Sequence, residues 1–244
     1  MQIDQVIVPN NGTNNSDRQV SASGEGARNY LRYMFGTFGE RLETVAWGPF
    51  RDSSARLADA EIRVALRQLW GDQQVARDEL VLEEVECWRG YTRADFLCVS
   101  GGALRVVEIK SDRDTLKRFD EQVRVYSAIA DRVTLVVGWS LAVHAMHEAP
   151  WWWEVVLAER GENTGVRFVQ LRDGSHNPEV ALNALLAMLP VNDLRRLGRR
   201  YGIQARVAGQ QLREFIAARV SGCEVRDAIS AWLSALSAQR NSTR

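Results

Sequence analysis

The fold of this chain is decided by residues 93–110, which read Arg93-Ala94-Asp95-Phe96-Leu97-Cys98-Val99-Ser100-Gly101-Gly102-Ala103-Leu104-Arg105-Val106-Val107-Glu108-Ile109-Lys110. Two largely apolar runs flank a pair of glycines, and a two-residue glycine turn accommodates the positive backbone angles of a tight hairpin. With these glycines as the turn, Asp95 lies directly across from Glu108. The sequence therefore predicts a β-hairpin that places two carboxylates side by side among apolar residues.

These two opposed carboxylates need a compensating charge. Like charges directly opposite each other on a sheet are destabilising, and an unpaired carboxylate among apolar side chains is costly. A divalent cation between Asp95 and Glu108 relieves both costs. Lys110, two residues beyond Glu108, projects from the same face of the strand. The pattern predicts a metal-dependent hydrolytic site at the ends of these strands.

The composition is that of a globular protein with a proper core. The chain has 244 residues, of which 45% are hydrophobic, and no apolar run approaches the roughly 18–20 residues of a membrane span. The first residues lack the basic-then-apolar pattern of a secretory signal. The three cysteines are scattered without a CxxC pair, which argues against a disulfide framework or a cysteine zinc site. We therefore expect a cytoplasmic protein that does not enter a membrane.

Charge is unevenly distributed, although the formal net charge is zero. Residues 58–160 carry 13 basic and 18 acidic residues, whereas residues 178–244 carry 10 basic residues, all Arg, and 5 acidic ones. A basic stripe on one helix face is predicted where Arg recurs at i, i+1, i+4 and i+5. It predicts contact with DNA phosphates, and a solvated helix surface is the alternative. The stripe consists of Arg195, Arg196, Arg199 and Arg200.

Three regions are predicted along the chain. Residues 1–57 form an N-terminal appendage that is partly flexible, because a polar Asn- and Gly-containing run precedes an aromatic segment. Residues 58–172 form the core, and residues 173–244 form a helical, Arg-rich C-terminal region. The fold class is α/β, with a mixed β-sheet core flanked by helices and a helical C-terminal tail.

Within the core, periodicity predicts the elements around the hairpin. Residues 57–70 carry apolar side chains at helical spacing and end at Gly71. Residues 111–130 are expected to form a helix, with Ser111 and Asp112 as its cap. The β-branched run at 132–138 is expected to form a buried strand. The second hairpin strand, this helix and this strand then form a parallel crossover unit.

The hairpin resembles the core of the PD-(D/E)XK nuclease superfamily, whose pattern stands here as Asp95 followed by Glu108-Ile109-Lys110. The following helix carries Gln122 and Tyr126, which match the Gln-x-x-x-Tyr motif of the RecB-like and Cas4-like branch. The longer run from 108 to 138 is similar to the sce7726 family of presumed PD-(D/E)XK proteins, which are bacterial and phage-associated. This resemblance covers roughly residues 59–160 and implies a restriction-endonuclease-like fold.

The resemblance implies a metal site with named ligands. Asp95 and Glu108 would hold Mg²⁺ or Mn²⁺ as hard oxygen ligands, and the carbonyl of Ile109 would be a third ligand. Glu61, on the preceding helix, would complete the shell directly or through water. For Glu61 the alternative is a solvated acid in the first turn of that helix.

The remaining matched residues would act on the water and the phosphate. Lys110 would position or deprotonate the attacking water and offset charge on the phosphorus. Gln122 and Tyr126, four residues apart on one helix face, would orient Lys110, the water or a phosphate. Together these residues imply a metal-dependent nuclease that acts on DNA.

Two other functional classes remain open. The chain could be a catalytically inactive nucleic-acid-binding module, in which Asp95, Glu108 and Lys110 form an internal ion cluster. It could also be a protein-interaction component, such as a phage or defence-system subunit that works with a partner protein or as a homodimer.

Overall fold

The structure of the chain is a computed structural model. It describes residues 56–77, 79–88, 90–161, 165–203, 207 and 209–242, without the side chains of residues 71–77. The N-terminal appendage predicted for residues 1–57 therefore lies almost entirely outside the described residues. No helix in the described part of the chain is both long and apolar enough to cross a bilayer.

Six strands form one mixed sheet: β1 (Leu80–Cys87), β2 (Thr92–Ser100), β3 (Ala103–Lys110), β4 (Arg132–Gly138), β5 (Glu154–Arg160) and β6 (Val166–Arg172). Their order in the sheet follows their order in the chain. The pairings of β3 with β4 and of β4 with β5 are parallel, and the other three are antiparallel. The predicted α/β class with a mixed sheet is confirmed.

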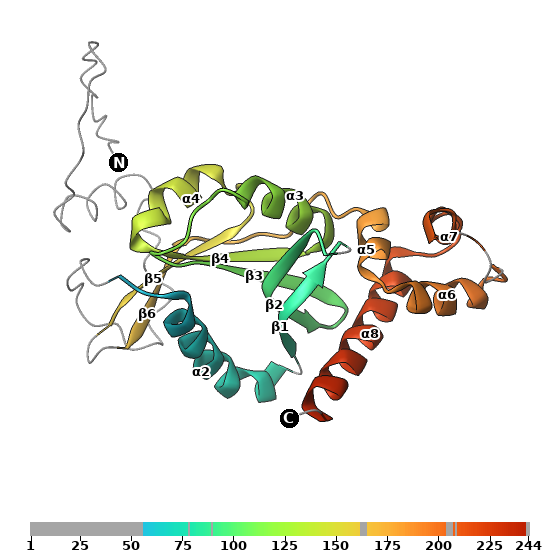
Figure 1. The fold of residues 1–244 in the computed structure, drawn as a ribbon, viewed down its shortest axis with the longest axis horizontal. Coiled ribbons are helices and arrows are strands. Elements are labelled where there is room, and N and C mark those ends of the chain that lie inside the picture. The colour runs from blue at the N-terminus through green and yellow to red at the C-terminus, as the bar shows by residue number, and fades with distance from the viewer. Residues whose placement is uncertain are drawn as a thin grey trace, which may run out of the picture.

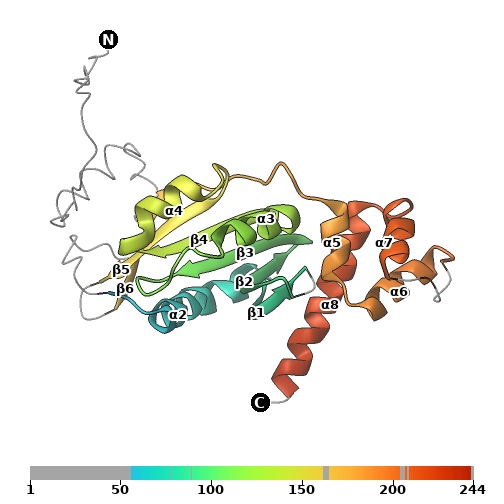
Figure 2. The same ribbon diagram turned by 45° about the horizontal axis from the view of Figure 1, so that its top comes forward.

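The helices cover both faces and one end of this sheet. They are α2 (Asp59–Arg77), α3 (Phe119–Ile129), α4 (Ala142–Glu148), α5 (Leu182–Met188), α6 (Val191–Arg200), α7 (Gly209–Ala217) and α8 (Gly222–Ser242), with a short 3-10 turn (Trp139–Leu141) before α4. Figures 1 and 2 show α2 on one face, α3 and α4 on the other, and α5 to α8 grouped at one end. The C-terminal tail is helical, as predicted.

Two apolar clusters follow from the alternation of side chains along the strands. Phe96, Val107 and their neighbours pack against Ile62 and the rest of the apolar side of α2. Val106 and the other residues of the opposite face pack against Phe119 and its helix α3. Apolar residues from α5 to α8 belong to this second cluster, so the C-terminal helices share the core of the sheet.

The hairpin has the predicted register. Gly101 and Gly102 have φ values of 55° and 78°, which are the positive angles that a tight two-residue turn requires. Phe96 pairs with Val107, and the next residues outward are Asp95 and Glu108. The strands β3 and β4 run parallel on either side of α3 in the chain, which confirms the predicted crossover unit.

Two helix boundaries differ from the predictions. The helix α2 continues past Gly71, because a glycine in a helix costs only about 1 kcal/mol relative to alanine. The helix α3 begins at Phe119 rather than near Ser111, and no side chain caps it. Asp112 instead accepts hydrogen bonds from the backbone of Leu57 (2.9 Å) and Ser140 (2.8 Å). The segment before α3 is therefore a loop fixed by long-range contacts.

Candidate active site

A cavity of about 390 Å³ lies where α2 and α3 approach the ends of β2 and β3. It contains five of the residues predicted for the site, and a sixth, Tyr126, contacts one of them from beneath. The lining is almost wholly polar. It consists of Asp59, Arg63, Glu84, Thr92, Arg93, Asp95, Glu108, Ile109, Lys110, Asp114, Arg118 and Gln122.

Glu108 is the centre of the hydrogen-bond network, and its side chain is buried. Its Oε1 accepts from Lys110 Nζ and from Gln122 Nε2, both at 2.5 Å. Its Oε2 accepts from the hydroxyl of Tyr126 at 2.7 Å. Three donors thus satisfy one buried carboxylate, which removes much of the cost of burying it. The predicted common face of Lys110 and Glu108 is confirmed, and Gln122 and Tyr126 do share a helix face, but both contact Glu108 and not Lys110.

Asp95 lies at the edge of the same cavity, one residue beyond the last paired residue of the hairpin. Its Oδ2 accepts a hydrogen bond from the backbone N–H of Ile109 at 2.7 Å, and its Oδ1 pairs with Arg63. Burial, and then the negative charge of Glu108, raise the pKa of Asp95 to about 7, although Ile109 and Arg63 act in the opposite direction. This carboxylate therefore lacks sufficient positive charge around it.

The metal-free protein should lose stability as the pH rises through neutrality. The pKa of Asp95 in the folded protein, about 7, exceeds its unfolded value of about 4. The folded state therefore holds this proton more tightly. The stability gained from it is fully present below about pH 4 and is lost as the pH passes about 7. We expect the thermal unfolding temperature to decrease as the pH is raised from about 5 to about 8. The decrease should be smaller in Asp95→Asn. Equal pH slopes for the two proteins in thermal melts would contradict this.

Two further groups complete the chemistry of the network. Burial, and then the charge of Glu108, raise the pKa of Tyr126 above its usual range, so its hydroxyl stays protonated and donates to Glu108. Gln122 Oε1 is buried and accepts no hydrogen bond from the described residues. Gln122 lines the cavity, and the atom that reaches Glu108 is its Nε2.

The structure does not bring Glu61 to the other predicted ligands. Its Oε2 accepts from the backbone N–H of Ala58 at 2.9 Å, and its Oε1 pairs with Arg160 at 2.5 Å. The acid that lines the cavity from α2 is Asp59. Successive helical residues are about 100° apart, so residues two apart point to nearly opposite sides. Glu61 is therefore not among the residues of the cavity, and the prediction that it belongs to the metal shell is wrong.

Several cavity residues were not predicted from the sequence. Arg63 pairs with Asp59 at 2.6 Å, four residues earlier on α2. Arg118 lines the cavity four residues before Gln122. This i, i+4 spacing is the signal that could have indicated both, because such residues lie on one helix face. No comparable signal indicates Glu84, which comes from the neighbouring strand β1.

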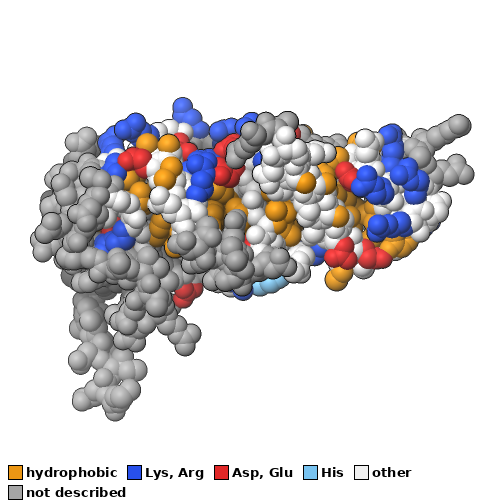
Figure 3. Space-filling view, turned by 90° about the horizontal axis from the view of Figure 1, so that it is seen from below, with side chains coloured by type: hydrophobic (Ala, Val, Ile, Leu, Met, Phe, Trp, Pro, Cys, Tyr) orange, Lys and Arg blue, Asp and Glu red, His pale blue; other side chains and the backbone are white. Residues whose placement is uncertain are grey.

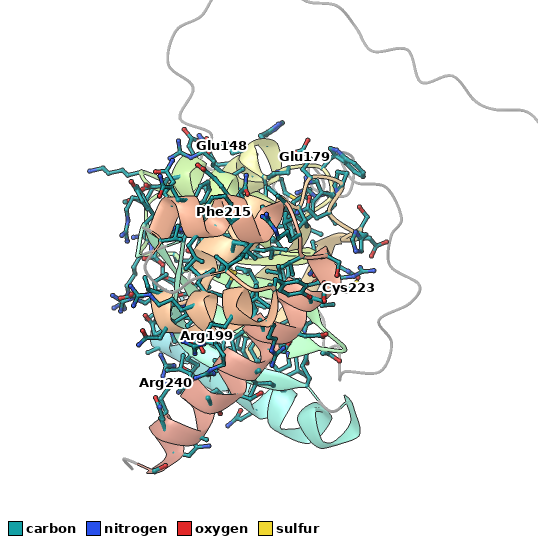
Figure 4. The ribbon with its side chains drawn as sticks, turned by 90° about the vertical axis from the view of Figure 1, so that its right-hand side faces the viewer. Glu148, Glu179, Arg199, Phe215, Cys223 and Arg240 are labelled. Carbon is teal, nitrogen blue, oxygen red and sulfur yellow. The ribbon has the colours of Figure 1, made fainter. Side chains whose placement is uncertain are left out.

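The predicted basic stripe lies away from this cavity. Arg196 pairs with Asp193 at 3.0 Å, and Arg199 and Arg200 are exposed on α6. Figure 3 shows basic side chains gathered at the end formed by the C-terminal helices, and Figure 4 shows Arg199 at that end. The hairpin tip lies on the same side as these helices, and the strand from there to the cavity spans about 20 Å. Contact between this basic stripe and DNA stays a prediction.

The donor set fits a divalent ion in its chemistry. Asp95 and Glu108, with the carbonyl of Ile109, are the hard oxygen donors that Mg²⁺ and Mn²⁺ prefer, and Asp95 is short of positive charge. Among the described residues, no three His, Cys, Asp or Glu side chains are grouped so that they could hold an ion. Each of the two carboxylates is instead paired with a cation of the chain itself.

Comparison with known proteins places the chain in a family. The profile of the family described as Bacteriophage P4 protein cII matches residues 53–243. The chain belongs to this family. The matched range contains every residue of the cavity and extends to the end of α8.

Two similar proteins can be compared with this member of the P4 cII family. Protein cII of Enterobacteria phage P4 is 27% identical over 148 residues, which are 60% of this chain and 55% of the phage protein. The chain thus matches only about half the length of that relative. A solved protein of unknown function from Silicibacter pomeroyi, SPO1766, is 18% identical over 60% of this chain and 83% of its own, with a TM-score of 0.32. None of these descriptions names an activity.

Proposed function

We propose that this member of the P4 cII family is a metal-dependent nuclease of the PD-(D/E)XK type, which hydrolyses phosphodiester bonds in DNA. The observation that carries the proposal is the network around Glu108. Lys110 from the same strand and Gln122 and Tyr126 from α3 all donate to this carboxylate, and Asp95 lies beside it in the same cavity. The resemblance to the nuclease superfamily assigns the same residues to one active site.

The cavity residues would divide the work of hydrolysis. When bound, Mg²⁺ or Mn²⁺ would activate water and polarise the phosphate, and Asp95 and Glu108 would hold it. Lys110 would donate to the reacting phosphate or position the water. Gln122 fixes Glu108 through Nε2. Tyr126 holds the other oxygen of Glu108 and is a positioning residue.

Positive side chains around the cavity suit a phosphate-bearing substrate. The side chain of Arg93 is 59% exposed at the cavity wall, and Arg118, which also lines the cavity, is exposed. Both would contact DNA phosphates near the reacting bond. The arginines of α6 would contact a more distant part of the same DNA.

A cleavage assay tests this function. Supercoiled, linear double-stranded and single-stranded DNA are incubated with the full chain and either Mg²⁺, Mn²⁺ or EDTA. We expect cleavage with a metal ion and none with EDTA. Lys110→Ala, purified in parallel, should give no products, which excludes a contaminating nuclease. Absence of cleavage of every DNA with both metals would refute the proposal.

One observation favours a second candidate, a nucleic-acid-binding module without catalysis. Arg63 pairs with Asp95 and Lys110 pairs with Glu108, so both carboxylates have cationic partners within the chain. The family match makes a phage protein a fitting partner for such a module. Salt-dependent DNA binding that is unchanged by EDTA, without cleavage, would favour this candidate.

A further inference from the structure

Arg63 lines the cavity and pairs with one oxygen of Asp95. Its side chain is 14% exposed, and its guanidinium lies among three carboxylates. The Nε atom is 2.6 Å from Asp59 Oδ2, and Nη2 is 2.9 Å from Glu84 Oε1. The same Nη2 pairs with Asp95 Oδ1. One positive charge therefore serves three negative ones, and it can leave any one of them without becoming unpaired.

The oxygen of Asp95 that Arg63 holds is the one that a metal ion would need. The other oxygen, Oδ2, accepts the backbone N–H of Ile109 at 2.7 Å, whereas Oδ1 is held by the Arg63 side chain, which can turn to another carboxylate. A guanidinium and a divalent ion repel each other strongly at contact distance. This repulsion disfavours the binding of both to Oδ1 at the same time.

Glu84 provides an alternative partner for the guanidinium. It has a φ of 51°, in the left-handed region that non-glycine residues rarely adopt. In β1 it stands between Glu83 and Val85, which pair with the two neighbours of Asp95. Arg240 of α8, labelled in Figure 4, donates to the carbonyls of Glu83 at 2.5 Å and Glu84 at 3.4 Å. This contact holds the strained segment, and with it a second carboxylate within reach of Arg63.

We infer that Arg63 is a built-in competitor of the divalent ion. It pairs with Asp95 in the metal-free protein and moves fully to Glu84 and Asp59 when the ion binds. The inference rests on the proposed metal site and extends it, because it names the residue that sets the ion concentration at which the site fills. The ion must displace one ion pair, so its affinity is lower than the two carboxylates alone would give.

Titration of the full metal-free chain with Mn²⁺, followed by calorimetry and by the loss of the free-ion electron paramagnetic resonance signal, tests the inference without an activity readout. Arg63→Met should bind Mn²⁺ at least about tenfold more tightly than the wild type, because one charge-assisted contact no longer competes. Glu84→Gln removes the alternative partner and should weaken binding. The control is Arg67→Met one turn along α2, whose exposed pair with Glu83 lies outside the cavity lining, and it should leave the affinity unchanged.

Arg63→Lys keeps the positive charge without the planar fork. Its affinity for Mn²⁺ should lie between that of the wild type and that of Arg63→Met. It provides the comparison if Arg63→Met does not fold, as judged by circular dichroism. Wild-type binding with equal or weaker binding by the folded Arg63 variants would overturn the competitor role and leave the metal site standing. Absence of Mn²⁺ binding in the wild type and in all variants would overturn both.

Discussion

Replacing Glu108 by glutamine is expected to reduce metal-dependent DNA cleavage by about a thousandfold or more. Glutamine keeps the shape of the side chain but removes its charge and turns one oxygen into a donor. That donor would face Lys110, Gln122 or Tyr126, all of which donate to Glu108 in the structure. The variant would lose both its hold on the ion and the fixed position of Lys110.

Initial rates on a fluorescently labelled DNA measure this effect. Glu121→Gln makes the same chemical change on the outside of α3, where Glu121 lies 4.0 Å from Arg124, and should cleave like the wild type. Circular dichroism confirms that both variants are folded. A Glu108→Gln protein that keeps more than about a tenth of the wild-type rate would show that Glu108 does not act in the reaction.

Replacing Asp131 by alanine is expected to lower the free energy of unfolding by about 3 kcal/mol. Asp131 is buried, and its Oδ2 accepts the backbone N–H of Leu104 at 2.8 Å and pairs with Arg226 of α8. The substitution leaves a buried N–H and a largely buried guanidinium without this partner. It therefore weakens the contact between the hairpin tip and the C-terminal helices.

Urea denaturation of the metal-free protein measures this change. Asp131→Asn can still accept the Leu104 N–H and should cost less than the alanine substitution. Arg196→Met removes an exposed arginine and should stay within about 0.5 kcal/mol of the wild type. Hydrogen exchange should show greater loss of protection in α8 than in α4. A change of less than about 0.5 kcal/mol in Asp131→Ala would contradict the anchoring role.

The hairpin and its network follow from local signals in the sequence. The glycine pair defines the turn and hence the register, and the period of the strand places Lys110 beside Glu108. The spacing of Gln122 and Tyr126 puts both on one helix face. These relations involve residues near each other in sequence or one crossover apart, and patterns in the sequence are informative at that range.

Local sequence patterns do not predict features that depend on contacts between residues far apart in the chain. Glu61 is drawn to Arg160, almost one hundred residues away in the chain, and Asp112 is fixed by Leu57 and Ser140 instead of capping a helix. Gly138 shows the same effect, because a Cβ atom there would lie 2.6 Å from the backbone nitrogen of Asp112. Nothing in the local sequence indicates these approaches.

Local sequence patterns also do not indicate the ion pairs around Asp95. The hairpin alone predicts a cation between two carboxylates, and the structure shows Arg63 and Lys110 as the cations nearest to them. Arg63 comes from a helix more than thirty residues earlier, and its third partner Glu84 comes from a strained position in β1. The raised pKa of Asp95, about 7, shows that this arrangement does not fully compensate the carboxylate.

The central claim is that Asp95 and Glu108 together bind a divalent ion. Crystals of the full chain soaked in Mn²⁺ and measured by anomalous scattering test it most directly. We expect an anomalous peak about 2.1 Å from an oxygen of each carboxylate, with the Arg63 guanidinium moved from Asp95 to Glu84. Crystals of both the wild type and Arg63→Met that show no peak at this place, at a Mn²⁺ concentration that supports DNA cleavage, would contradict it.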